Sequence, residues 1–190
     1  MIRFENLEKQ LEAFKKYVIQ QSKANLLKGG KHGAHSATGK LISSIDAESK
    51  VSKNSFELDF LMEDYASFVD LGVKGKKSSA KAPNSPYRFG SGSGKKGGLT
   101  QGIDKWVRLK GIQFKSKETG MKLSYKNTAF LITRGIYNKG IKPTLFFTKP
   151  FEKGFKRLDD EMIEAFGLDV DEFLKFTLKN IKSWLIQQYL

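Results

Sequence analysis

Apolar residues recur at steps of three and four along the first 28 residues, which is the spacing of one face of a helix. This stripe consists of Phe4, Leu7, Leu11, Phe14 and Val18. We predict an amphipathic helix over residues 4–28, ended by Gly29 and Gly30. A small, polar stretch then leads to Thr38, which can cap a short helical turn that ends near Ile45.

The next apolar positions alternate with polar ones, which is the period of a half-buried strand. Phe56, Leu58, Phe60 and Met62 carry this pattern. The turn residues 53–55 connect it to an earlier strand over 47–52, so we predict an antiparallel hairpin. A short helix follows from Tyr65 and stops at Gly72.

Residues 73–98 have almost no apolar side chains beyond Tyr87 and Phe89, and they repeat Gly, Ser and Lys. Such a composition buries too little surface to offset the entropy of ordering, so we expect a long flexible basic arm. Residues 99–140 are expected to form a helical insertion. Its helices should span about 100–110, with a stop at Gly111, and 127–138.

The last third of the chain has the most regular pattern. Thr148 and Pro150 provide a cap and a first-turn proline, and an apolar stripe then runs to Gly167. Asp169 and Glu172 have the spacing of a capping box, which predicts a separate last helix from about Val170 within a C-terminal extension over 167–190. The fold class is therefore expected to be α+β, with a small antiparallel sheet packed against an N-terminal helix and long C-terminal helices.

The chain of 190 residues and 21.5 kDa is the size of a single domain, so we expect one core over residues 1–190. It contains no cysteine, which excludes disulfides, thiolate metal sites and a cysteine nucleophile. No apolar run approaches the roughly 18 residues of a membrane span, and the charged N-terminus does not resemble a signal peptide. We expect a protein with no membrane association, kept inside a cell or packed into a particle assembled there.

The net charge of +14 is concentrated in the middle of the sequence. Residues 72–126 contain fourteen Lys and Arg, and their acids are Asp104 and Glu118 alone, whereas residues 1–71 are neutral and residues 127–190 carry +2. Such a segment favours a polyanion or an acidic protein surface as partner. The alternative is a solvated loop whose lysines only maintain solubility. The candidate contact residues are Lys74, Lys76, Lys77, Lys81, Arg88, Lys95 and Lys96.

Residues with catalytic potential are sparse. His32 and His35 lie in one glycine-rich loop with no carboxylate nearby, which argues against a metal site. The stretch from Gly90 to Lys95 lacks the spacing of a phosphate-binding loop, and no apolar strand precedes it. We expect no enzymatic activity, no cofactor and no bound metal.

Three short motifs, in this order, resemble the tailed-bacteriophage neck or tail-completion proteins, the head-tail joining family related to minor tail protein Z of lambda-like phages. They are residues 38–45 (TGKLISSI), 65–72 (YASFVDLG) and 143–151 (PTLFFTKPF). The resemblance covers residues 1–72 and 141–166. The basic segment from 73 to 140 and the extension over 167–190 depart from the family pattern.

The resemblance implies a non-catalytic virion protein, assembled in the host bacterial cytoplasm. Such a subunit forms a six- or twelve-fold ring in contact with the portal and the adjacent neck and tail proteins. The basic arm could then face packaged DNA or an acidic portal surface. The competing interpretation is a cellular nucleic-acid-binding protein of ribosomal or nucleoid-associated type, in which Tyr87 and Phe89 beside Arg88 stack on unpaired bases.

Overall fold

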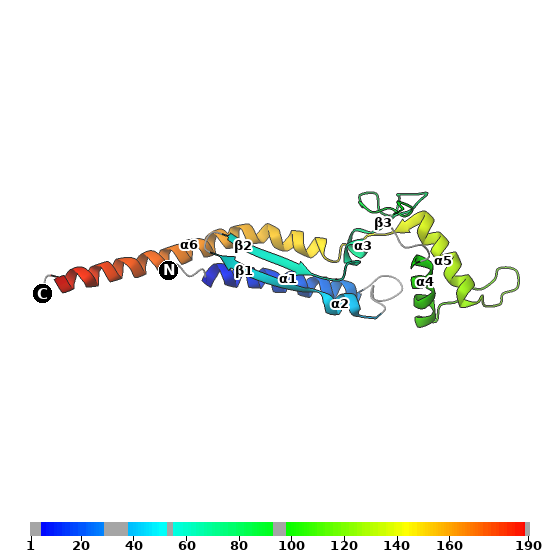
Figure 1. The fold of residues 1–190 in the computed structure, drawn as a ribbon, viewed down its shortest axis with the longest axis horizontal. Coiled ribbons are helices and arrows are strands. Elements are labelled where there is room, and N and C mark those ends of the chain that lie inside the picture. Colours follow the sequence, from blue (N-terminus) through cyan, green and yellow to red (C-terminus); the bar gives the residue numbers. More distant parts are fainter. Residues whose placement is uncertain (1–4, 29–37, 53–54, 93–97, 189–190) are drawn as a thin grey trace. The chain divides into compact units, whose positions relative to one another are not determined.

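A computed structural model describes residues 5–28, 38–52, 55–92 and 98–188 of the protein (Figure 1). The fold is α+β, as expected, with helices and small antiparallel strand pairs. Its internal contacts form two compact units. Unit 1 comprises Met1–Ala24, Ile45–Leu61 and Phe147–Leu190, and unit 2 comprises Asn25–Ser44 and Met62–Phe146.

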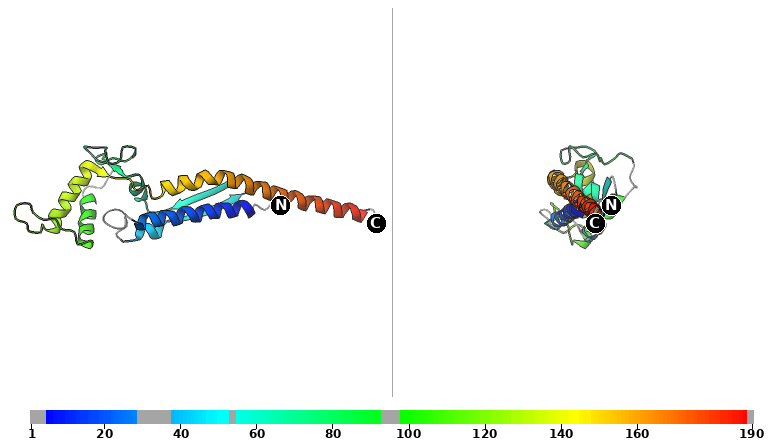
Figure 2. Two further views of the ribbon diagram at one scale, coloured as in Figure 1. Left: turned by 180° about the vertical axis from the view of Figure 1, so that it is seen from behind. Right: turned by 90° about the vertical axis from the view of Figure 1, so that its left-hand side faces the viewer.

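Unit 1 is built on a β-hairpin that lies along two long helices (Figures 1 and 2). Strands β1 (Asp46–Ser52) and β2 (Ser55–Leu61) pair antiparallel, with Asp46 opposite Leu61 and Lys50 opposite Glu57. Helix α1 (Glu5–Lys28) begins in this unit, and α6 (Thr148–Gln188) completes it. The predicted N-terminal helix and the predicted hairpin are confirmed.

The core of unit 1 joins both helices and the hairpin. Phe14 and Val18 of α1 pack with Leu158 of α6, and the rings of Phe60, Phe147 and Phe151 surround them. The ring centroids of Phe14 and Phe151 lie 5.7 Å apart in an edge-on arrangement, which is favourable for aromatic pairs. Phe151 and Leu158 of the apolar stripe predicted before Gly167 belong to this core, whereas Phe155 and Phe166 of the same stripe are 47% and 50% exposed.

Helix α6 corrects the prediction of two separate C-terminal helices. It runs without a break from Thr148 to Gln188, so Gly167 does not end it, and Asp169 does not begin a new helix. Asp169 is buried and accepts hydrogen bonds from the backbone N–H groups of Asn6 and Leu7, at 3.1 and 3.2 Å. Its carboxylate therefore caps the first turn of α1, where N–H groups lack partners within the helix.

Unit 2 contains short elements and one helical pair. Helices α2 (Lys40–Ser44) and α3 (Ala66–Leu71) precede strand β3 (Val73–Lys74), which pairs with β4 (Gly140–Ile141). Helices α4 (Gly98–Leu109) and α5 (Tyr125–Lys139) pack against each other and bury Val107 and Ala129. The predicted helices over 38–45, 65–72, 100–110 and 127–138 are each present within a few residues.

Residues 73–92 correct the expectation of an arm without structure of its own. The segment contains β3, and its backbone forms an ordered loop in which Lys74 N–H donates to Tyr87 O and Phe89 N–H donates to Lys74 O. Ala82 and Ser85 are almost fully buried. Backbone hydrogen bonds supply much of this order, and ring contacts of Tyr87 and Phe89 add to it. Residues 93–97 lie outside the described residues.

Candidate polyanion-binding surface

The net positive charge of the protein belongs to one of its two units. Unit 1 has 14 Lys and Arg against 15 Asp and Glu, a net charge of −1. Unit 2 has 20 basic against 5 acidic residues, a net charge of +15. A field of this strength, confined to one unit, attracts polyanions at a distance and sets the orientation in which they approach.

The loop over residues 73–92, which we call the basic loop, is fixed to the end of α5. The N–H groups of Lys76 and Lys77 donate to Tyr137 O at 2.8 Å and Asn138 O at 3.1 Å. These carbonyls belong to the last turn of α5, where they lack partners within the helix. The helix end therefore holds the segment that carries the candidate lysines.

Several of the predicted contact residues are exposed on this loop, namely Lys76, Lys77, Lys81 and Arg88, whereas Lys74 is half-buried. Arg88 donates to Gly75 O and to Ser79 Oγ, the latter at 2.9 Å. Lys81 Nζ lies 3.3 Å from Gly140 O, and the Lys76 ammonium lies 5.8 Å from the centre of the Tyr137 ring. The structure thus gathers five of the predicted residues on one loop. Lys95 and Lys96 lie outside the described residues.

The aromatic side chains beside Arg88 already have partners in the fold. Tyr87 makes an edge-on contact with Phe68 at 4.4 Å between ring centroids, and Phe89 contacts Tyr137 at 5.9 Å. Both are half-buried. Their packing leaves less ring surface for base stacking, so the charge of the loop, rather than its aromatic residues, is what it can offer to a nucleic acid.

Parts of the three sequence motifs meet around α3. Thr144 N–H, from the third motif, donates to Asp70 O of the second at 3.1 Å, and Leu145 N–H donates to the same carbonyl. Ser44 of the first motif accepts a hydrogen bond from Glu63 N–H, just before the second. Lys40 forms an exposed ion pair with Glu63 at 2.8 Å, and this contact raises the pKa of Lys40. No sequence pattern predicted that these motifs would be neighbours.

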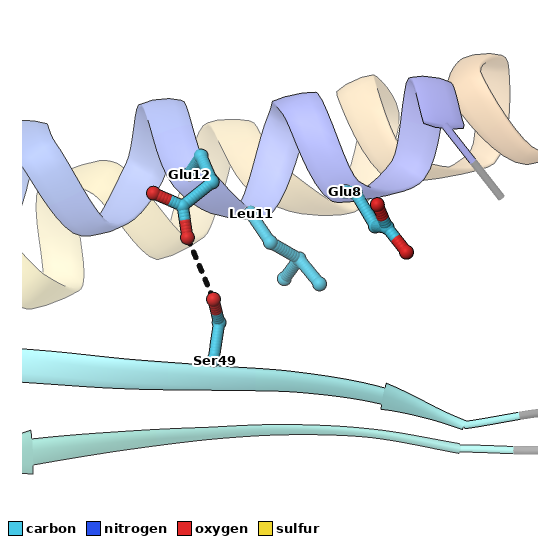
Figure 3. A pocket seen from close by; sticks show the side chains of 4 residues that line it. All are labelled: Glu8, Leu11, Glu12 and Ser49. Atoms are coloured by element: carbon cyan, nitrogen blue, oxygen red, sulfur yellow. Dashed lines mark hydrogen bonds between the residues drawn. The ribbon is translucent and has the colours of Figure 1, made fainter.

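A pocket of about 260 Å³ lies in unit 1 between α1 and β1, lined by Glu8, Leu11, Glu12 and Ser49 (Figure 3). Glu12 accepts hydrogen bonds from Lys15 Nζ and from Ser49 Oγ, which holds its pKa below the usual value. A carboxylate held ionised in this way is a poor general acid near neutral pH.

Metal-binding clusters are absent from the parts of the chain that the structure describes, where no three His, Cys, Asp or Glu side chains converge. His32 and His35 lie outside these parts. Within the same described ranges, no helix combines the length and the apolar character needed to cross a bilayer.

Replacing Glu12 with Gln tests the electrostatics of this pocket. Because folding lowers the pKa of Glu12 from 4.5, its ionised form stabilises the fold above that value, and this stabilisation is lost as the pH falls through the folded-state pKa. The side chain is 40% exposed, so we expect Glu12→Gln to cost less than about 1 kcal/mol at neutral pH. The difference between the two proteins in urea unfolding should vanish in acid, and a difference independent of pH would contradict this origin.

Comparisons of the chain with protein-family models, with curated proteins and with solved structures give no match.

Proposed function

We propose that this chain is a structural, non-catalytic subunit of a tailed-bacteriophage virion. In this proposal it forms an oligomeric ring in the head-tail connector, between portal and tail. The observation that carries the proposal is the division of charge, with a net charge of −1 on unit 1 and +15 on unit 2. The ordered motifs at residues 38–45, 65–72 and 143–151, which resemble those of neck proteins, supply the identity of the particle.

The two units fit two different tasks in such a ring. Unit 1 exposes large apolar side chains along α6, including Ile163, Leu174 and Leu178, and exposed apolar side chains of this size favour subunit contacts. Unit 2 presents its lysines on a loop fixed by backbone hydrogen bonds, which suits packaged DNA or an acidic portal surface. The six- or twelve-fold symmetry comes from the resemblance alone.

The alternative, a cellular nucleic-acid-binding protein, draws support from the same basic loop. It is disfavoured by the packing of Tyr87 and Phe89 against Phe68 and Tyr137, because those rings were the candidates for base stacking. It also leaves the long, apolar-faced α6 without a role.

Deleting the gene for this chain from the phage genome tests the proposal. We expect filled heads and free tails that do not join, seen by electron microscopy, and restoration of joined particles when the protein is supplied from a plasmid. Purified virions should also contain several copies of the chain by mass spectrometry. Normal particles in its absence, or virions that lack the chain, would overturn the proposal.

The lysines of the basic loop should contribute to DNA binding by contacting the phosphates of the DNA. We expect Lys76→Gln with Lys77→Gln to weaken binding to duplex DNA and to lower the slope of log K against log salt by about 0.9 for each phosphate that the protein no longer neutralises. The matched control is Lys9→Gln with Lys16→Gln, two exposed lysines of α1 in the near-neutral unit, which should change neither quantity. Equal effects of the two pairs would show that position in the basic loop does not matter.

A further inference from the structure

The second half of α6 presents one exposed face that is both acidic and apolar. Positions 160, 164, 167, 171, 174 and 178 are spaced alternately by four and three residues, so they share one side of the helix. Six of the side chains exposed on or beside this line form what we call the outer face of α6: Asp160, Ile163, Glu164, Asp171, Leu174 and Leu178. Lys175 is exposed beside them and pairs with Asp171. Ile163 is 73% exposed, and Leu174 and Leu178 are 52% and 63% exposed, so the line carries several exposed large aliphatic side chains.

The acidity of this face belongs to a longer acidic run. Between Arg157 and Lys175 the sequence contains seven Asp and Glu and no Lys or Arg. Asp169 is turned inward, where it caps α1, and Asp171 pairs on the surface with Lys175 at 2.6 Å. Over about 28 Å of helix, the outer face therefore combines negative charge with exposed aliphatic side chains.

A surface of opposite charge lies on the turn that connects α4 and α5. Phe114 and Met121 are 42% and 70% exposed there. Lys115, Lys117 and Lys122 are exposed beside them. We call these five side chains the tip.

The turn that carries the tip is ordered by hydrogen bonds within it. Ser116 N–H donates to Met121 O at 2.8 Å, and Leu123 N–H donates to Phe114 O at 2.7 Å. Gln113 Nε2 also donates to Leu123 O at 2.9 Å. A surface that is ordered before binding loses less conformational entropy when it binds.

We propose that the tip of one copy of this chain docks on the outer face of α6 of a second copy. Phe114 and Met121 pack on Ile163 and Leu174, while the lysines of the tip face Asp160, Glu164 and Asp171. Both surfaces occur on every copy, so charge complementarity is satisfied by the protein itself. Pairing of two outer faces, or of two tips, would instead bring like charges together, which is unfavourable.

The proposed contact joins two different surfaces, so a pair of copies still has one free tip, on one copy, and one free outer face, on the other. Contacts of this type repeat from copy to copy and generate a ring when the rotation closes. The ring itself rests on the proposed function, whereas the contact is a property of the purified protein. Failure of the proposed ring would be recognised in virions, whereas failure of the proposed contact would be recognised with the purified protein in solution.

Charge reversal on each surface tests the proposal. One variant carries Asp160→Lys, Glu164→Lys and Asp171→Lys, and the other carries Lys115→Glu, Lys117→Glu and Lys122→Glu. All six residues are exposed, so both variants should fold, which circular dichroism and urea unfolding verify. Association is measured on the full chain by analytical ultracentrifugation at low and at high ionic strength.

We expect the unmodified protein to associate more strongly at low salt, and each variant alone to associate at least tenfold more weakly. An equimolar mixture of the two variants should recover association, because each supplies the charge that the other no longer has. The control, Lys9→Glu with Lys16→Glu on α1, should associate like the unmodified protein.

Three results would overturn the proposal. The first is an unmodified protein that stays monomeric throughout, and the second is a tip variant that associates normally, which would mean that α6 pairs with itself. The third is a mixture that fails to recover association when both variants are folded.

Discussion

Replacing Gly140 with alanine is expected to destabilise unit 2 by about 2 to 5 kcal/mol. Gly140 lies at the junction of α5 and β4. Its φ is +83°, a backbone conformation that residues other than glycine rarely adopt. A Cβ atom there would lie 2.3 Å from Val73 O and 2.6 Å from Gly75 N. Both are backbone atoms beside the β3–β4 pairing, so they cannot move away without breaking it.

Urea unfolding and hydrogen exchange measure this effect. The amides of Lys76 and Lys77, which donate to the end of α5, should lose protection first. The matched control is Gly135→Ala in the same helix, where a Cβ would meet no atom within 4 Å. Because alanine favours helix, the control should gain roughly 0.5 to 1 kcal/mol of stability. Similar stability in the two variants would contradict the close approach at Gly140.

Replacing Asp169 with Asn is expected to lower the stability of unit 1 by about 1 to 3 kcal/mol. The Asp169 carboxylate accepts three hydrogen bonds from Asn6 and Leu7, including one from Asn6 Nδ2 at 2.8 Å. An asparagine amide would turn an N–H₂ donor toward N–H donors. It would also remove the negative charge that the N-terminal end of α1 favours.

The control for this change is Asp171→Asn on the same helix. Asp171 is exposed and pairs with Lys175, so its replacement should cost no more than about 0.5 kcal/mol. Urea unfolding compares the two variants, and hydrogen exchange at Leu7 reports the first turn of α1. If Asp169→Asn and Asp171→Asn are equally stable, the carboxylate does not cap α1.

The helices and the hairpin could be read from the sequence because each has a local period. The stripe of Leu7, Leu11, Phe14 and Val18 marks the buried side of α1, and alternation from Phe56 to Phe60 marks β2. These patterns report which side of an element is apolar. They do not report which other element covers it.

For that reason the prediction of a separate last helix was wrong, and α6 is instead continuous. Asp169 with Glu172 has the spacing of a capping box, and Gly167 before it has the character of a helix stop. The carboxylate does cap a helix, but one whose first turn lies 163 residues away in the sequence. A cap between distant segments leaves no local signal.

The composition of the basic loop correctly predicted its positive charge. It also predicted a flexible arm, whereas residues 73–92 form an ordered loop. Its lysines identify it as a charged surface in the sequence, and five of the seven named residues lie on the described part of the loop. Its order comes partly from the packing of Tyr87 and Phe89 against other rings, and partly from backbone groups that meet the final carbonyls of α5 and the strand pair at Gly140. Backbone hydrogen bonds do not depend on side-chain pattern, so composition alone indicated an arm without structure.

Local periodicity and residue counts were enough to establish the α+β class, most helix and strand positions, and the concentration of positive charge. The three-dimensional structure was needed to show that the net positive charge belongs to one of two units, that α6 is continuous, and that Asp169 caps α1. It also decided which apolar side chains of α6 are covered by α1 and which remain exposed. Those features depend on contacts between segments far apart in the chain, and the geometry of such contacts is fixed by packing rather than by the pattern within either segment.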